Sequence, residues 1–156
     1  MMDINEALAL KRWWRFRTCE SLWSTFLKYK YCTIDHPVKK KWRTGQSHGW
    51  KKLMQVKDKV EDNMLWKINS SNSSLWWDNW TGFGDIAQVI YYDYSLANQT
   101  VNDIIVDGRW SIDHLQLPEY MTEQILSITI GDTRSMMLIF GCQLILANLL
   151  QHWVGG

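Results

Sequence analysis

The sequence has few cysteines, no long uninterrupted apolar run and no secretory leader pattern, and each absence excludes a class of protein. Its three cysteines are odd in number and share no paired spacing, which argues against a disulfide framework and fits a reducing compartment. The apolar stretch at 136–150 is broken by a glycine and two polar residues and falls short of the roughly 20 residues that a membrane helix needs. Residues 1–16 carry charges inside their apolar stretch, so no signal peptide is expected. We therefore expect an intracellular protein, nuclear or cytoplasmic and not secreted, that makes no use of a membrane.

The composition is that of a folded chain with an unusual amount of tryptophan. Hydrophobic residues make up 46% of the 156 residues and charged residues 21%, so disorder throughout the chain is not expected. This length suffices for one domain with its own core but not comfortably for two. The eleven tryptophans predict extensive aromatic packing, because the large indole side chain usually anchors a core or an interface.

The net charge of +1 hides two halves of opposite sign. Residues 1–67 contain fifteen Lys and Arg against seven Asp and Glu, whereas residues 68–156 contain two against nine. Only the first half should therefore attract phosphate.

The first half predicts three helices separated by polar segments. Asp3 is a suitable N-cap for a helix through residue 16, and apolar residues recur at helical spacing in 20–31. A third helix should begin at Ser47 and run past residue 64, with a buried stripe formed by Trp50, Leu53, Val56, Val60 and Met64. On its other face, Lys57 and Glu61 should form an exposed pair. Between the second and third helices, residues 32–49 are polar and basic and should form a loop.

The second half predicts shorter elements. Residues 64–68 and 75–80 read as two strands joined by a polar hairpin turn. Residues 101–106 form a short apolar element, Asp107 and Gly108 form a turn, and 118–128 form a helix that opens with Pro and Glu. The expected fold class is α-rich α+β: one small domain, complete or not, with three N-terminal helices, a short β-hairpin and loosely organised short elements. Its regions are a basic helical region at 1–67, an acidic region with a Trp-rich hairpin at 68–130, and an apolar tail at 131–156.

The strongest candidate for a functional site is a basic run in the loop and the start of the third helix. Its lysines offer charges to phosphates, and its tryptophans could stack on unpaired bases. The alternative is a solvated loop whose two tryptophans belong to the core. The candidate nucleic-acid-binding residues are Lys39, Lys40, Lys41, Trp42, Arg43, Trp50, Lys51 and Lys52.

Other patterns in the sequence do not amount to a catalytic or metal site. The motif at 91–94, YYDY, resembles a polymerase signature but lacks the second adjacent carboxylate that a two-metal mechanism needs. Cys32 and His36 have the spacing of half a zinc site, without a second tight pair to complete four ligands. We expect no catalytic residues, no metal, no cofactor and no small-molecule substrate.

Several segments resemble plant LINE-type (non-LTR) retrotransposon reverse transcriptase polyproteins, in the stretch that follows the polymerase. The similar segments cover most of residues 3–130 and occur in the family's order: DINEALALKRWWRF (3–16), SLWSTFLKYKYC (21–32), WKKLMQVKDKVEDNMLWKIN (50–69), SSLWWDNWTGFG (73–84) and VNDIIVDGRWSIDHL (101–115). The first departs from the family's smoother ALLAKWWWRF-like run. In that family the stretch joins the polymerase to a zinc-binding-like segment and often to ribonuclease H, and it is taken as connecting structure.

The resemblance implies a non-catalytic remnant of such a polyprotein, since the polymerase and ribonuclease H residues lie outside this stretch. At most it would bind nucleic acid without sequence preference, with RNA or single-stranded DNA as partner; the oligomeric state is left open. After residue 130 the resemblance ends. Codons for 136–150, read in a shifted frame, can encode the polar pattern that relatives carry there, so we interpret the tail as out-of-frame sequence outside the ancestral fold.

Two alternative functions follow from other parts of the chain. A Trp-rich carbohydrate- or protein-binding module would present Trp76, Trp77 and Trp80 as an exposed, coplanar platform. A small membrane-associated protein would use 136–150 as its anchor, which the length and polar interruptions of that stretch disfavour.

Overall fold

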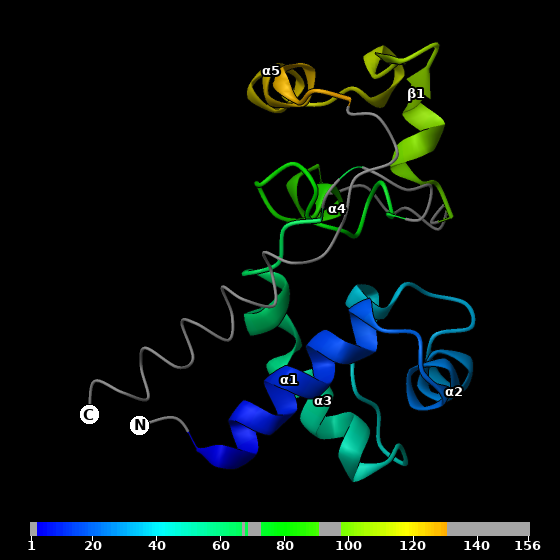
Figure 1. Ribbon diagram of the computed structural model, residues 1–156, viewed down its shortest axis with the longest axis vertical. Helices are drawn as coiled ribbons and strands as arrows, with labels where there is room; N and C mark the ends of the chain where they lie inside the picture. Colours follow the sequence, from blue (N-terminus) through cyan, green and yellow to red (C-terminus); the bar gives the residue numbers. More distant parts are fainter. Residues whose placement is uncertain (1–2, 67, 69–72, 91–97, 131–156) are drawn as a thin grey trace. The chain divides into compact units, whose positions relative to one another are not determined.

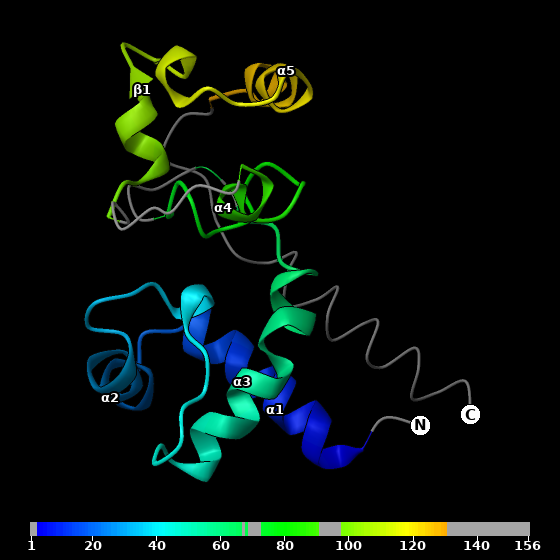
Figure 2. The same cartoon turned by 180° about the vertical axis from the view of Figure 1, so that it is seen from behind.

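The computed structural model describes residues 3–66, 68, 73–90 and 98–130, which fall into two compact units (Figures 1 and 2). Within these residues the first unit ends at Met64 and the second begins at Leu65. The described part of the chain is helix-rich with one two-stranded antiparallel hairpin, which confirms the predicted α-rich α+β class. The YYDY motif at 91–94, which was not expected to be a polymerase site, and the tail at 131–156 lie outside the described residues.

The three predicted helices of the first unit are present, and each begins at a side chain that caps it. Helix α1 (Ile4–Thr18) starts after Asp3, whose carboxylate accepts a hydrogen bond from the Asn5 backbone N–H at 3.3 Å. Helix α2 (Leu22–Tyr31) starts with a reciprocal capping box between Ser21 and Ser24. Helix α3 (His48–Glu61) starts after Ser47, whose hydroxyl accepts from the Trp50 N–H. Each cap pairs a backbone donor that the helix itself cannot satisfy, which fixes where the helix begins.

The core of the first unit is an aromatic cluster where α1 lies alongside α3 (Figure 1). Trp13 and Phe16 from α1 are fully buried, and the Phe16 ring meets Trp50 of α3 edge-on at 5.7 Å. Tyr31, at the end of α2, stacks on Trp50 with ring centroids 4.4 Å apart. The predicted stripe is buried, but the helix ends at Glu61 and does not run past residue 64 as predicted, so Met64 is buried beyond the end of α3.

Two predictions about the polar and apolar faces of these helices are wrong. Lys57 and Glu61 are not an exposed pair: Lys57 is 8% exposed and donates to the carbonyls of Val38 and Lys40, while the Glu61 carboxylate binds Arg17 of α1 at 2.7 Å. Both residues turn to partners far along the chain because α1 and the loop cover that face of α3. Conversely, most of the apolar positions of α2 face solvent. Only Leu27 of the predicted face is buried, and the exposed members are Leu22 (94%), Trp23 (41%) and Phe26 (56%).

The second unit is built from short elements around one apolar core. The elements are α4 (Ile86–Val89), the 3₁₀ turn η2 (Val101–Ile104), strands β1 (Ile105–Val106) and β2 (Arg109–Trp110), the 3₁₀ turn η3 (Asp113–Leu115), and α5 (Glu119–Ser127). The two strands pair antiparallel across Asp107 and Gly108, which have φ values of 50° and 72°. Both φ values are positive, as the tight hairpin turns that match strand twist require, which explains the Asp-Gly pair. The predicted turn at 107–108 and the predicted C-terminal helix are therefore confirmed.

The hairpin does not lie where the sequence predicts it. Residues 75–77 form a turn rather than a strand, and Ser74 makes an isolated antiparallel bridge with Thr100 instead of pairing with residues 64–68. The Asp78 carboxylate accepts from the Ser74 backbone N–H at 2.8 Å and closes this turn. Leu75, Trp76 and Trp80 are buried because they belong to the unit's core, and Trp77 packs against that core partly buried; the core does not require them to be in a strand.

Among the described residues, no helix combines the length and the apolar character needed to cross a membrane. The stretch at 136–150 lies outside the described residues, so this finding does not include it.

Candidate nucleic-acid interface

The loop between α2 and α3 is fastened to α3 by a buried lysine. The Lys57 ammonium donates to the Val38 carbonyl at 2.6 Å and to the Lys40 carbonyl at 2.9 Å. These carbonyls lie at the 3₁₀ turn η1 (Pro37–Lys39) and directly after it. Burying an ammonium group is costly unless it is hydrogen-bonded, so this contact holds the loop backbone to the helix.

Two of the candidate cations share one carboxylate. The Lys40 ammonium lies 2.6 Å from the Asp35 carboxylate, and the Lys39 ammonium lies 3.8 Å from the same group. The hydrogen bond from Lys40 lowers the pKa of Asp35, so this carboxylate is charged at neutral pH. The charge that Lys39 and Lys40 offer to a ligand is therefore partly balanced within the loop.

Lys41 and Arg43 follow these two lysines in the sequence, and both are exposed. The backbone turns at 43–46, where Arg43 and Gln46 exchange two hydrogen bonds, one of them from the Arg43 N–H to the Gln46 side chain at 2.8 Å. Gly45 has φ of 91°, a conformation that favours glycine. This tight turn presents Lys41 and Arg43 to solvent, and no carboxylate among the described residues pairs with either.

The two candidate tryptophans differ from each other. Trp50 is 1% exposed and is a core residue, so the hypothesis that it stacks on a base at the surface is wrong. Trp42 is half-buried, and the Lys51 ammonium sits 4.7 Å from the centre of its ring. That contact is a cation–π interaction, which occupies one face of the Trp42 indole. Lys52, the last candidate, is exposed.

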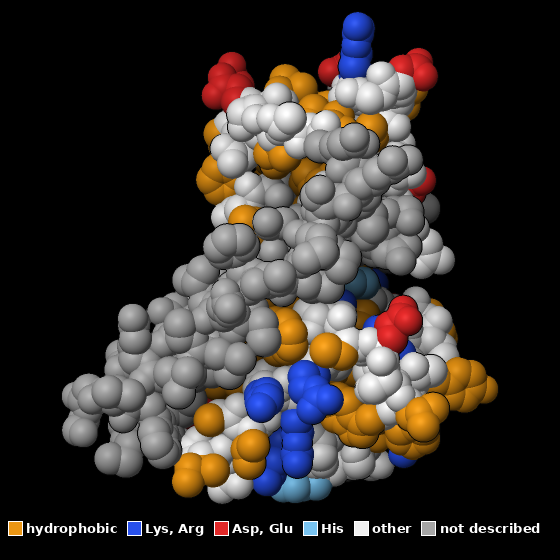
Figure 3. All heavy atoms as spheres, viewed as in Figure 1, with side chains coloured by type: hydrophobic (Ala, Val, Ile, Leu, Met, Phe, Trp, Pro, Cys, Tyr) orange, Lys and Arg blue, Asp and Glu red, His pale blue; other side chains and the backbone are white. Residues whose placement is uncertain are grey.

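Helix α1 supplies cations that the sequence-based site missed. Lys11, Arg12 and Arg15 are exposed, and no carboxylate among the described residues pairs with them. Lys and Arg side chains gather over α1 and α3 in Figure 3, beside exposed apolar side chains of α2. Helical spacing in the sequence could have identified these cations. A helix that buries Trp13 and Phe16 turns positions 11, 12 and 15 toward solvent.

Cys32 and His36 both lie in partly buried surroundings in the first unit. No group of three potential ligands occurs within the described part of the chain. Burial raises the pKa of the Cys32 thiol to about 11. The His36 Nδ1 accepts a hydrogen bond from the Val38 backbone N–H at 3.4 Å and caps the 3₁₀ turn.

His36 should make the first unit sensitive to mild acid. Burial, reinforced by the positive charges of Arg17 and Lys28, lowers the pKa of His36 from 6.5 to about 2. The unfolded chain therefore binds this proton below about pH 6.5 while the folded chain does not, and the unfolding free energy should fall by up to ~1.4 kcal/mol per pH unit there. Urea unfolding between pH 7.5 and 5, followed by circular dichroism, should show this slope.

The matched control is His36→Asn, whose side-chain oxygen can still accept from the Val38 N–H but does not titrate. This variant should lose most of the dependence between pH 7.5 and 5. An unchanged slope would assign the acid sensitivity to other groups.

The tryptophans of the second unit do not form a sugar-binding platform. Trp76 and Trp80 are each 3% exposed, and their indole N–H groups donate to the Gln99 side chain and the Leu75 carbonyl. Trp80 also stacks on Trp110 with ring centroids 5.7 Å apart. Because two of the three rings are buried, the exposed coplanar arrangement that a carbohydrate-binding surface needs is not present.

No protein-family model, curated protein or solved structure matches this chain.

Proposed function

We propose that residues 3–64 bind single-stranded nucleic acid through its phosphates, without sequence preference and without catalysis. The observation that carries the proposal is a set of exposed cations without a carboxylate partner among the described residues, drawn from α1, α2, the loop and α3. Its members are Lys11, Arg12, Arg15, Lys30, Lys41, Arg43 and Lys52. Unpaired cations are the groups that neutralise phosphates and release counterions.

The cations of the first unit fall into two groups: those that bind carboxylates or carbonyls of the protein, and those without a carboxylate partner among the described residues. Arg17 and Lys57 are buried and used to join elements, and Lys59 is held by Glu6 at 2.7 Å. Of the remaining cations, Arg12 and Arg15 line one pocket together with Trp23, an exposed aromatic residue of α2. Cations that follow a backbone, together with aromatic rings on which bases stack, are the usual elements of single-strand binding.

The sequence resemblance supports the same proposal. A segment that follows the polymerase in a plant LINE-type polyprotein works beside an RNA template and its DNA copy. In this proposal the chain is the non-catalytic connector of such a polyprotein, and its partner is RNA or single-stranded DNA.

Salt dependence tests the phosphate contacts. With about four phosphates neutralised, the log–log slope of affinity against salt should be roughly −3 for single strands. Replacing Lys41 and Arg43 together by Ala should reduce its magnitude by about 1.4, because each contact contributes ~0.7. Fluorescence titration of labelled single-stranded RNA with the full chain, at several salt concentrations, measures both slopes.

The matched control replaces Lys39 and Lys59 by Ala. It removes the same two positive charges from the same unit, but these ammonium groups lie beside Asp35 and Glu6. Its slope should stay close to that of the parent. Equal effects of the two pairs would show that net charge alone governs binding, and absence of binding at low salt would refute the proposed function.

A further inference from the structure

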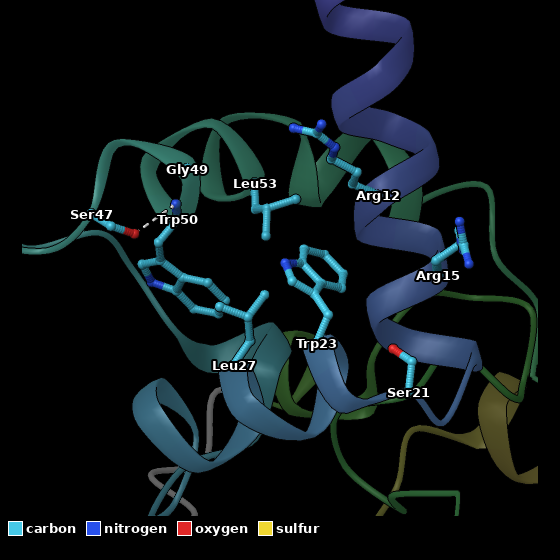
Figure 4. Close-up of a pocket in the computed structure, with 9 residues that line it drawn as sticks. All are labelled: Arg12, Arg15, Ser21, Trp23, Leu27, Ser47, Gly49, Trp50 and Leu53. Atoms are coloured by element: carbon cyan, nitrogen blue, oxygen red, sulfur yellow. Dashed lines mark hydrogen bonds between the residues drawn. The ribbon is translucent and has the colours of Figure 1, made fainter.

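Helices α1 and α2 and the start of α3 line a cavity of about 590 Å³ in the first unit, which is open to solvent on one side (Figure 4). This volume lies within the range of roughly 300–1,000 Å³ that is usual for pockets that bind small molecules. The cavity is lined by Arg12, Arg15, Ser21, Trp23, Leu27, Ser47, Gly49, Trp50 and Leu53. Its lining thus contains two cations and no carboxylate.

Trp23 provides an aromatic surface inside this cavity. Its indole projects from α2 toward the middle of the cavity and is 41% exposed, although it is surrounded by apolar groups (Figure 4). The Phe16 ring packs against it nearly perpendicularly, with an interplanar angle of 81° and ring centroids 6.3 Å apart. This contact holds the indole while leaving part of its surface free. Leu27 and Leu53 complete apolar walls between Trp23 and the buried Trp50.

The charged edge of the cavity comes from α1. Arg12 extends from α1 toward α3, and Arg15 lies one turn further along with its guanidinium directed outward (Figure 4). The two residues are one turn apart on α1 and their guanidinium groups point to opposite sides in Figure 4, so they would meet different phosphates of a strand. Arginine matches the geometry of phosphate through two parallel hydrogen bonds. A planar apolar group joined to a phosphate fits these features.

We propose that this cavity binds one unpaired nucleotide of a single-stranded nucleic acid, with its base stacked on Trp23 and its phosphates held by Arg12 and Arg15. The inference rests on the proposed function and adds a defined base site to it. Ser47 and Gly49, at the end of the basic loop, form one wall of the cavity. Arg43 lies only four residues before Ser47 in the chain, so the basic loop ends at this wall of the cavity.

An abasic oligonucleotide separates base stacking from phosphate binding. Trp23→Ala should weaken binding of a labelled oligoadenylate by roughly 5- to 150-fold, with little change in salt slope, because stacking contributes that much per base. For a strand of the same length without bases, parent and Trp23→Ala should bind equally. Trp23→Phe should restore much of the loss, and Arg12→Ala with Arg15→Ala should reduce the slope by about 1.4.

Tyr29→Ala is the matched control, since Tyr29 is an aromatic residue of the same helix, 79% exposed and outside the cavity. It should leave the affinity within about twofold of the parent, as surface changes usually do. A Tyr29→Ala loss equal to that of Trp23→Ala, or abasic and intact strands of equal affinity, would overturn the base site while the salt-dependent binding of the proposed function stands. Absence of binding to either strand would remove both proposals.

A competition experiment distinguishes binding of a strand from binding of a free nucleotide. Adenosine monophosphate should compete at least tenfold more weakly than the oligoadenylate, because it makes none of the loop contacts. Equal affinity would show that the cavity serves a free nucleotide and would overturn the assignment to a strand.

Discussion

Replacing Trp50 by Ala should lower the unfolding free energy of the first unit by about 3–5 kcal/mol. Trp50 is 1% exposed, and its ring meets Tyr31 face to face and Phe16 edge-on. Trp13 lies against the same ring at 6.4 Å. Removing the indole would leave a cavity among three aromatic rings from two helices, which cannot close without moving a helix. A loss of this size is a large part of the stability of a small unit.

Trp23→Ala removes the same side chain from a position that is 41% exposed and serves as the control. This variant should lower the unfolding free energy by less than half as much as Trp50→Ala, because the replacement exposes less buried apolar surface to water. Urea unfolding of the full chain, followed by circular dichroism, gives the overall effect. Hydrogen exchange of α1 and α3 peptides assigns it to the first unit. Similar losses for the two variants would contradict the central position of Trp50 in the core.

Replacing Glu61 by Ala should be nearly as damaging, at about 3–5 kcal/mol, although Glu61 is a charged residue near a helix end. Its Oε1 accepts from the Trp13 indole N–H at 2.8 Å and from the Arg17 Nε at 2.7 Å. The side chains of Arg17 and Glu61 are only 6% and 11% exposed. The variant would leave a buried guanidinium without this carboxylate and a buried indole without its acceptor, and both are costly.

Two further variants separate these contributions. Glu61→Gln keeps an acceptor for Trp13 but removes the negative charge, so it should fall between Glu61→Ala and the parent. Replacing Arg17 and Glu61 together by Met should recover much of the loss, because buried ion pairs are often replaceable by apolar residues of similar volume. A Glu61→Ala cost below about 1 kcal/mol would be that of an exposed ion pair and would contradict the burial described above.

Elements that depend on neighbouring residues could be predicted from the sequence. Four buried apolar positions of α3, namely Trp50, Leu53, Val56 and Val60, follow from helical periodicity, and Asp3 and Ser47 cap their helices as such residues do. The turn at 107–108 could be predicted because Asp-Gly adopts positive φ at low cost. In the same way, the exposed cations at 41 and 43 follow from a loop rich in Lys and Gly.

The candidate site could be predicted only in part. Trp42, Trp50 and Trp23 are chemically identical in the sequence, yet they are half-buried, fully buried and exposed within a cavity. Lys40 and Lys41 are adjacent, but only Lys40 has a carboxylate within hydrogen-bonding distance. The cations of α1 join the site because α1 packs against α3, a contact between segments some forty residues apart.

The sequence by itself determined the three helices of the first unit, the starting points of α1 and α3 and the separation of positive from negative charge, because each depends on residues within a few positions or on composition. The tertiary structure alone decided that Lys57 and Glu61 are buried, that most apolar residues of α2 are exposed and that residues 75–77 form a turn. The free energy of burying a side chain depends on which distant groups cover it and whether they satisfy its charge and hydrogen bonds. Those partners lie 17 to 48 residues away for Lys57 and Glu61, beyond the reach of any local pattern.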